Sequence, residues 1–254
     1  MAASMDGRRV IVTGGASGIG LAVAAQFLAS GAHVGIVSRT QRSIESALAG
    51  PLQADSQPVH ARAADVSDEE DLASAISGLA CALGGLDTLV TSAGIEGEMG
   101  ASLTDVTSEG FREVLDVNVL GVFHAVKCAV PLLAQSPSAS VTMVGSDSGF
   151  VAVPGMLAYN ASKGALVQLT RALSYELFDE HCIRVNSVCP SIVDTPMARR
   201  GLGVESFQDA AYPVNSPDDV ARTVLFLSAP ESRSLNGLNL LMDFGYTARS
   251  SFPA

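Results

Sequence analysis

The chain has 254 residues, enough for one large α/β domain or two small ones. The formal net charge of -11 argues against nucleic acid and anionic membrane surfaces as partners. The four cysteines form no C-x-x-C pair and the four histidines are scattered, so neither a metal site nor a disulfide framework is expected, and the reducing cytoplasm is the expected location.

Short β-branched runs alternate with helical stretches along the whole chain. The expected strands are at residues 10–13, 33–37, 59–63, 88–91, 140–144, 184–188 and 237–242, and the expected helices are near 18–29, 41–49, 68–83, 108–134, 156–179 and 217–228. Two helix starts carry capping signals, namely Ser67 with Glu70 and Ser216 before Pro217. This alternation predicts a single α/β domain over residues 1–254, a Rossmann-type doubly wound seven-stranded parallel sheet with helices on both faces.

Two segments need a separate interpretation. Residues 10–38 contain no Asp, Glu, Lys or Arg and would pass for a membrane span by hydropathy. Six glycines interrupt this stretch, which is better explained as strand, glycine loop, buried helix, turn and strand, so no membrane association is expected. The least regular segment, residues 194–215, is interpreted as a flap over the substrate.

The segment TGGASGIG, residues 13–20, follows the first expected strand and opens the first expected helix. Its glycines at 14, 18 and 20 give the spacing G-x-x-x-G-x-G, which differs from the more common G-x-G-x-x-G. Glycine permits a tight turn and a close backbone approach, and a helix N-terminus attracts a pyrophosphate. The segment therefore predicts a dinucleotide-binding loop, with a plain turn between strand and helix as the alternative.

The end of the second expected strand, IVSRT, bears on which dinucleotide binds. An acidic residue there would hold the ribose hydroxyls of NAD, but this chain has Ser38 followed by Arg39. Because a guanidinium suits a 2′-phosphate, NADP is the expected cofactor and NAD the alternative. A second interpretation is that Arg39 caps the next helix. Asp65 and Val66, at the end of the third expected strand, are expected near the adenine ring.

The segment YNASK, residues 159–163, places a tyrosine and a lysine on one face of a helix, one turn apart. Lys163 is one of only two lysines in the chain, against thirteen arginines, which favours a specific role. A tyrosine has an ordinary pKa of about 10, and a neighbouring ammonium favours the phenolate. Lys163 is therefore expected to lower the pKa of Tyr159 and so to prepare it for acid/base chemistry.

Two further polar residues join this pair. Ser146 lies thirteen residues before Tyr159, just past an expected strand, where its hydroxyl could polarise a substrate carbonyl. Ser148 is a competitor for that role. Asn118 is polar within an otherwise apolar helix and is interpreted as holding a water in a proton path. Each residue alone has an ordinary structural explanation, but the combination behind a glycine loop predicts an active site.

Together these motifs resemble the single-domain short-chain dehydrogenase/reductase family, from about residue 9 to residue 245. The resemblance rests on T-G-x-x-x-G-I-G at 13–20, Asp65, A-G at 93–94, Asn118, Ser146, Y-x-x-x-K at 159–163, and the proline and threonine of PSIVDT at 190–195. This joint pattern is highly specific for the family. It departs from the family at TSAG (91–94), where the family usually reads N-N-A-G, at Pro190–Ser191 and at DFG (243–245).

The resemblance implies an NAD(P)-dependent oxidoreductase that interconverts a small-molecule secondary alcohol and a ketone. In the implied catalytic tetrad, Tyr159 is the acid/base, Ser146 orients the carbonyl, Lys163 binds the nicotinamide ribose and tunes Tyr159, and Asn118 anchors a water relay. The implied cofactor contacts are Gly14, Ser17, Gly18, Ile19, Gly20, Ser38, Arg39, Asp65, Val66, Ala93, Gly94, Tyr159, Lys163, Pro190, Val193 and Thr195. A homotetramer packed through the helices near 108–134 and 156–179 is also implied.

Two other functions stay open. A non-catalytic nucleotide sensor on the same fold would not need Tyr159 and Lys163. A lyase or dehalogenase on this scaffold would replace the lysine with arginine and lose the glycine loop. The substrate is expected to contact residues 148–156, Ile95 and Glu96, a mostly apolar surface with one carboxylate at its mouth. The net charge argues against an acyl chain borne on a carrier protein.

Overall fold

The computed structural model of the protein describes residues 5–53 and 58–249. Its strands form one sheet in the order β3-β2-β1-β4-β5-β6-β7, and every neighbouring pair is parallel. The strands are β1 (Arg9–Thr13), β2 (His33–Ser38), β3 (His60–Ala63), β4 (Thr88–Thr91), β5 (Ser140–Val144), β6 (Arg184–Pro190) and β7 (Asn239–Met242). The expected doubly wound parallel sheet is confirmed, and each strand boundary lies within two residues of its expected position.

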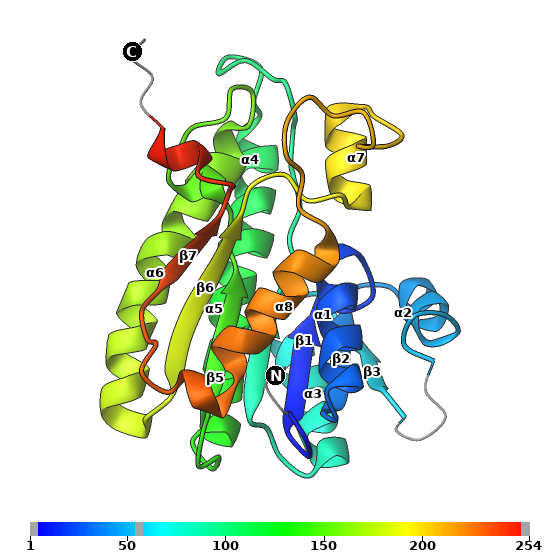
Figure 1. Ribbon diagram of the computed structural model, residues 1–254, viewed down its shortest axis with the longest axis vertical. Coiled ribbons are helices and arrows are strands. Elements are labelled where there is room, and N and C mark those ends of the chain that lie inside the picture. Colours follow the sequence, from blue (N-terminus) through cyan, green and yellow to red (C-terminus); the bar gives the residue numbers. More distant parts are fainter. Residues whose placement is uncertain (1–4, 54–57, 250–254) are drawn as a thin grey trace.

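Helices cover both faces of this sheet, as expected (Figure 1). The α-helices are α1 (Gly18–Ala29), α2 (Gln41–Leu48), α3 (Glu69–Leu83), α4 (Ser108–Leu115), α5 (Gly121–Leu133), α6 (Leu157–His181), α7 (Pro196–Leu202) and α8 (Pro217–Ser228). One apolar core joins α1, α2 and α8 to one face, and a second joins α3, α5 and α6 to the other. The two cores explain the nearly continuous apolar strands, because a strand with helices on both sides exposes neither face.

Two helix starts show how capping is decided. Ser216 caps α8 through a capping box with Asp219, and Pro217 occupies the first helical turn, as expected. The expected box of Ser67 and Glu70 is wrong, because Asp68 caps α3 and accepts from the backbone N–H groups of Glu70 and Asp71. The hydroxyl of Ser67 instead donates to Asp65 at 2.6 Å. Asp68 lies one residue closer to the helix than Ser67, and its carboxylate takes the N-cap position that the sequence pattern had assigned to the serine.

The helix expected over 108–134 is interrupted. A π-helical turn, η1 (Asp116–Leu120), separates α4 from α5 and contains Asn118. The span Ser108–Leu133 is long and apolar enough to cross a membrane by length and composition alone, a test that core helices of globular folds also pass. In this structure α5 buries one side against α3 and the sheet. The π turn is a local widening of the helix of the kind found at functional sites.

The segment 194–215, expected to be irregular, contains the helix α7. Its two ends are joined to each other, because the N–H of Asp194 donates to the carbonyl of Asn215 and the N–H of Asn215 donates to the carbonyl of Ile192, both at 2.9 Å. In Figure 1, α7 stands beyond the carboxyl ends of the strands. The segment is therefore a closed loop that leaves and rejoins the fold at one place.

All seven strands point in the same direction, so their carboxyl ends form one edge of the sheet. The strand order reverses between β1 and β4, and ligands of open α/β sheets bind at such a switch point. The glycine loop follows β1, and the segment SAG follows β4. The topology therefore brings two of the expected cofactor-binding segments together at this edge.

Candidate active site

Gly14 lies at the switch point, in contact with the segment that follows β4. Its φ is +69°, and a Cβ there would lie 2.7 Å from the backbone nitrogen of Ala93. The hydroxyl of Thr13 is within 3.3 Å of the backbone nitrogen of Ser92, which donates to it. Only glycine combines this left-handed conformation with so close a backbone approach. The predicted positions Gly14, Ala93 and Gly94 are therefore brought together.

The next glycines fix the start of α1. A Cβ on Gly20 would lie 2.3 Å from the carbonyl oxygen of Gly14, so the loop folds back directly on the first turn of the helix. Ser17 is the N-cap residue, but its side chain accepts no hydrogen bond from the helix. The first N–H groups of α1 are thus left for another acceptor, which suits an anionic group such as a pyrophosphate. Gly18 and Ile19 belong to this same turn.

The residues expected to choose between NAD and NADP lie at the ends of β2 and β3. The hydroxyl of Ser38 is 3.0 Å from that of Ser43. Arg39 is exposed, and its charge contributes to lowering the pKa of Asp65, after the larger effect of the Ser67 hydrogen bond. The cap of α2 is Thr40, which accepts from the N–H of Ser43 at 3.3 Å. The interpretation of Arg39 as a helix cap is therefore wrong, and its guanidinium faces solvent beside the sheet edge.

Asn118 is buried, with 1% of its surface exposed, and its amide ties two segments together. It accepts from the N–H of Ile95 at 2.8 Å and donates to the carbonyl of Ile95 at 2.9 Å. Its second N–H donates to the hydroxyl of Ser162 on α6 at 3.1 Å. Because both amide hydrogens are used by the protein, only a lone pair of the side-chain oxygen remains for a water. The side chain of Asn118 therefore connects the loop after β4 to α6, the helix that carries Tyr159.

Ser146 follows β5 and caps a short 3-10 turn, η2 (Asp147–Gly149). Its hydroxyl accepts from the N–H of Ser148 at 3.1 Å and donates to the carboxylate of Asp147 at 3.1 Å. A hydrogen bond from the side chain of Ser146 also acts on the pKa of Tyr159. Ser146 is therefore the serine that faces the tyrosine. Its competitor Ser148 instead holds the Ser146 hydroxyl in place through its backbone N–H.

Tyr159 and Lys163 lie one turn apart on α6, as expected. The ammonium of Lys163 is 5.4 Å from the centre of the Tyr159 ring. It donates to the carbonyl of Val144, at the end of β5, at 3.0 Å. Lys163 is 7% exposed, which is rare for a lysine without an ionic partner. The hydrogen bond from Lys163 to Val144 joins α6, which carries Tyr159, to β5, which precedes Ser146.

The pKa shifts of this pair differ from the expectation. Burial raises the pKa of Tyr159 to about 12, opposed by the hydrogen bond of Ser146 and reinforced by the charges of Asp147 and Glu96. Burial lowers the pKa of Lys163 to about 8. The expected lowering of the Tyr159 pKa by Lys163 is therefore wrong for this structure. Burial penalises the charged phenolate, and this penalty outweighs the attraction of an ammonium that donates its hydrogen bond to a carbonyl.

The remaining predicted cofactor contacts follow β6. Pro190 ends the strand and is buried, and Val193 forms a parallel bridge with Asn215. Thr195 caps α7 by accepting from the N–H of Ala198 at 3.2 Å, with Pro196 next to it, as the sequence predicted. The methyl of Thr195 faces the glycine loop, since a Cβ on Gly18 would lie 3.5 Å from it. The start of α7 thus lies against the start of α1.

Three segments meet at the mouth of the site. Arg200 on α7 forms an ion pair with Glu96 at 3.1 Å. The N–H of Gly100 donates to the carbonyl of Gly155 at 2.8 Å, which joins the loop after β4 to the loop before α6. A Cβ on Gly201 would lie 2.9 Å from the terminal carbon of Met99, so α7 packs closely on the same loop. These contacts link α7, within segment 194–215, to the segments expected to contact substrate.

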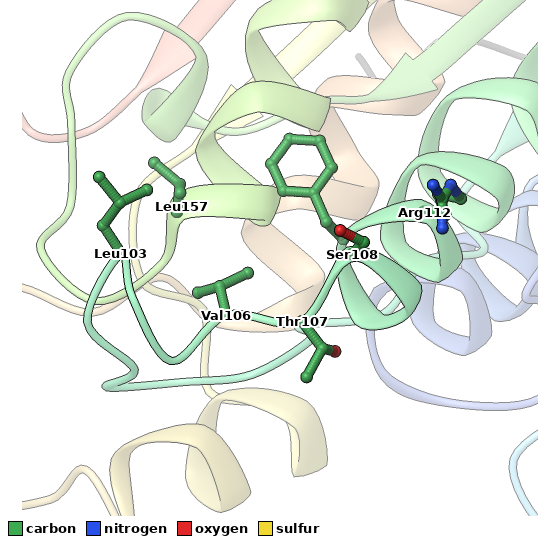
Figure 2. Close-up of a pocket in the computed structure, with 7 residues that line it drawn as sticks. Leu103, Val106, Thr107, Ser108, Arg112 and Leu157 are labelled. Carbon is green, nitrogen blue, oxygen red and sulfur yellow. The ribbon is translucent and has the colours of Figure 1, made fainter.

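A separate pocket of about 320 Å³ lies beside the start of α4 (Figure 2). It is lined by Leu103, Val106, Thr107, Ser108, Phe111, Arg112 and Leu157. None of these residues belongs to the predicted site. Within residues 5–53 and 58–249, no group of three or more His, Cys, Asp or Glu side chains is arranged to hold a metal ion.

Three contacts in this geometry were not predicted from the sequence, although Ile95 was expected to contact substrate. Ile95 and Ser162 are the hydrogen-bond partners of Asn118, and Asp147 is the partner of Ser146. No spacing in the sequence joins positions 95, 118 and 162, because their contacts are made through the tertiary fold. Asp147 did carry a signal, since a carboxylate directly after the expected active serine is a charge placed at the reaction centre.

Comparisons with known proteins find similar sequences over nearly the whole chain. A family model described as "Enoyl-(Acyl carrier protein) reductase" matches residues 14–247. The 2-(R)-hydroxypropyl-CoM dehydrogenase of Xanthobacter autotrophicus is 35% identical over 248 residues, which cover 95% of this chain and 99% of that protein. Momilactone A synthase of Oryza sativa subsp. japonica is 34% identical over 261 residues, 98% of this chain and 93% of that protein.

Solved structures show the same architecture. Levodione reductase has a TM-score of 0.89 at 27% identity, over 96% of this chain and 99% of that one. ElxO with NADP bound has a TM-score of 0.86 at 27% identity, over 95% of this chain and 99% of that one. The 3-ketoacyl-(acyl-carrier-protein) reductase from Brucella melitensis, complexed with NADH, has a TM-score of 0.86 at 29% identity, over 96% and 100%.

Proposed function

The chain belongs to the short-chain dehydrogenase/reductase family and is an NAD(P)-dependent oxidoreductase that interconverts secondary alcohols and ketones, and on that premise we propose how its own residues carry out the reaction. The proposed catalytic residues are Asn118, Ser146, Tyr159 and Lys163. The observation that carries the proposal is that Ser146 and Lys163 both converge on Tyr159, from a strand end and from the same helix.

Tyr159 acts as the acid/base. In ketone reduction its hydroxyl gives a proton to the carbonyl oxygen, and in alcohol oxidation its phenolate removes the hydroxyl proton. The nicotinamide cofactor, when bound, supplies or accepts the hydride. Ser146 holds the substrate oxygen beside the phenol. Asn118 keeps the segment after β4 attached to α6, so that the cofactor side and the acid/base side of the site stay in register.

Lys163 has two proposed tasks. Its ammonium binds the nicotinamide ribose, and it holds α6 to the end of β5 through the carbonyl of Val144. Its pKa of about 8 means that it gains and loses charge close to the working pH of many enzymes. Binding of a polar ribose would replace part of the hydration that burial removes, and would raise this pKa. Tuning of Tyr159 by Lys163 is therefore proposed for the complex with cofactor.

The residues that would hold the cofactor fit a dinucleotide. The close approach of Gly14 to the backbone of Ala93 keeps the glycine loop compact, and the start of α1, which has no side-chain cap, suits a pyrophosphate. Ala93 and Gly94 would border the ribose, and Pro190, Val193 and Thr195 would hold the carboxamide side. Asp65 and Val66 would border the adenine, although Asp65 already accepts both the N–H and the hydroxyl of Ser67.

NADP is the proposed preferred cofactor. Ser38 stands where an acid would bind the NAD ribose, and the exposed Arg39 offers a charge for the 2′-phosphate. Structural neighbours of this chain have been solved with NADP and with NADH, so both cofactors suit the fold. Initial-rate kinetics with NADP and NAD at one ionic strength test this choice. A higher kcat/KM with NAD would overturn it.

The proposed substrate class rests on the side chains expected at the mouth of the site. The expected contact surface, residues 148–156, is mostly apolar, and the carboxylate expected at its mouth, Glu96, is paired with Arg200. This supports a small apolar secondary alcohol or ketone, covered by the flap 194–215 of a single catalytic domain. Activity on a panel of 2-octanol, cyclohexanol and 1-phenylethanol tests the class. A non-catalytic sensor would bind NADP yet turn over none of them.

We also propose a homotetramer located in the cytoplasm. Exposed apolar side chains lie on α5 and α6, among them Phe123, Leu157 and Phe178. Contiguous apolar patches on monomers commonly mark interfaces, and packing of these two helices against a partner would cover the three side chains. Light scattering at micromolar concentration should give about four times the 26.0 kDa of one chain. A species of one-chain mass alone would refute the assembly.

A further inference from the structure

The hydroxyl of Ser146 is shared between two polar neighbours. It donates to the Oδ1 atom of Asp147 at 3.1 Å and accepts from the backbone N–H of Ser148 at 3.1 Å. A hydroxyl has one proton and two lone pairs. While the carboxylate holds that proton, Ser146 offers only a lone pair to Tyr159 and to the oxygen of the substrate.

We propose that Asp147 is a positioning residue, which holds the Ser146 proton away from Tyr159 and so makes Ser146 a hydrogen-bond acceptor in the resting site. An accepting Ser146 pairs with the neutral phenol or with the hydroxyl of an alcohol, both of which donate. The phenolate needs a donor, so Ser146 lowers the pKa of Tyr159 only when its proton turns away from Asp147. The inference rests on the proposed roles of Tyr159 and Ser146 and adds the group that sets the direction of their hydrogen bond.

The surroundings of Asp147 support this role. Helix α6, which packs against η2, carries Tyr159 and Lys163. The charge of Asp243, after β7, contributes to raising the pKa of Asp147. The charge of Asp147 in turn contributes to raising the pKa of Cys189 on β6. In the part of the chain that the structure describes, no ion pair to Asp147 is found. Its carboxylate is partly buried and depends on hydrogen bonds from Ser146 and Ser148. Burial raises the pKa of Asp147, and the hydrogen bond from Ser146 opposes that rise.

The proposal predicts a change in pH dependence when the carboxylate is replaced. An ionised carboxylate is a stronger acceptor than a neutral amide. In Asp147→Asn the Ser146 proton is free to turn toward the phenolate, which would then form at lower pH. The midpoint of kcat/KM for alcohol oxidation, which rises as the base ionises, should therefore fall by roughly half to one pH unit.

The measurement uses 1-phenylethanol with NADP, or the member of the panel above that turns over fastest, between about pH 6 and about pH 10. Glu96→Gln is the matched control, because Glu96 also raises the pKa of Tyr159 by its charge, but its side chain accepts from Arg200 rather than contacting Ser146 in the part of the chain that the structure describes. Both changes are repeated in a Ser146→Ala background, with enzyme in excess so that slow single turnovers can be followed. Thermal melting checks that each variant folds.

The double-mutant comparison separates the mechanisms. The charge of Asp147 also acts directly on Tyr159, as that of Glu96 does, so a small shift remains without Ser146 in both cases. If Asp147 acts through Ser146, the shift of Asp147→Asn is much smaller in the Ser146→Ala background than with Ser146 present, while the shift of Glu96→Gln is the same in both. An equal shift of Asp147→Asn in the two backgrounds would show a direct charge effect alone and overturn the proposal, as would no shift in either background. If Asp147→Asn does not fold, Asp147→Ser gives the same test. Failure of the proposed tetrad is recognised separately, by turnover that survives Tyr159→Phe.

Discussion

Replacing Asn118 should cost both stability and turnover, because its side chain joins the loop after β4 to helix α6. Asn118→Ala leaves the N–H and the carbonyl of Ile95 without their partners and removes one donor to Ser162. A buried polar group left without a partner costs about 1–3 kcal/mol. Ile95 is only partly buried, so water recovers part of this, and we expect a loss of roughly 2–4 kcal/mol.

For a protein of this size, 1 kcal/mol corresponds to a melting-temperature change of about 2–4 °C. The melting temperature of Asn118→Ala should therefore fall by roughly 5–12 °C at fixed protein concentration. Asn118→Asp keeps the acceptor for the N–H of Ile95 but places an oxygen against its carbonyl. Burial would raise the pKa of this new carboxyl, so the variant should regain stability as the pH falls through that raised value.

Asn186 on β6 provides the matched control. It is fully buried, donates to the carbonyl of Leu235 at 2.9 Å and accepts from the N–H of Leu238 at 3.0 Å, on a strand of the sheet outside the proposed tetrad. Asn186→Ala should lose comparable stability and keep kcat per folded enzyme, whereas Asn118→Ala should lose kcat as well. The reasoning fails if Asn118→Ala melts like the wild type, or if both variants lose kcat equally.

Three other changes test separate parts of the site and the fold. Tyr159→Phe should lower turnover by roughly 10²–10⁴-fold while cofactor binding survives, and activity within about tenfold of wild type would contradict the acid/base role. Wild type should prefer NADP over NAD by about tenfold or more at low salt, and Ser38→Asp with Arg39→Leu should reverse the order; because Arg39 is exposed, added salt should reduce the preference, and a salt-independent preference would argue against a phosphate contact. Asp87→Asn should lower the unfolding free energy at neutral pH, because hydrogen bonds from Arg9 and Ser136 hold the pKa of Asp87 well below its usual range despite burial. That stabilisation is present above the unfolded pKa of about 4 and is lost as the pH falls toward the much lower folded pKa, so the difference between the two proteins in urea titrations should begin to shrink below about pH 4 and continue to shrink with further acid; a difference unchanged between about pH 6 and about pH 2 would contradict it.

The amino-acid sequence determined the fold class and the elements that carry the proposed site residues, because those signals are short in range. The alternation of strands and helices, the glycine spacing at 14, 18 and 20, and the four-residue step from Tyr159 to Lys163 are all local patterns. Each corresponds to a fixed backbone period or turn, so its geometry can be worked out without knowing the rest of the chain. The parallel sheet, and a tyrosine and lysine on one helix face, were predicted in this way.

Other features depend on contacts between distant segments or on competition among neighbours. Asp68 rather than Ser67 caps α3 because the carboxylate lies in better position once the helix has formed. The π turn at Asn118 and its bridge from Ile95 to Ser162 require three segments that only the tertiary fold brings together.

The pKa of Tyr159 shows the difference most clearly. Sequence spacing places an ammonium beside the phenol and predicts a lowered pKa, whereas the structure raises it to about 12. The direction of the Tyr159 pKa shift depends on how much water is removed from the phenol and the ammonium, and on where the ammonium donates its hydrogen bonds. Burial and hydrogen-bond direction are properties of the packed structure, and no local pattern of residues contains them.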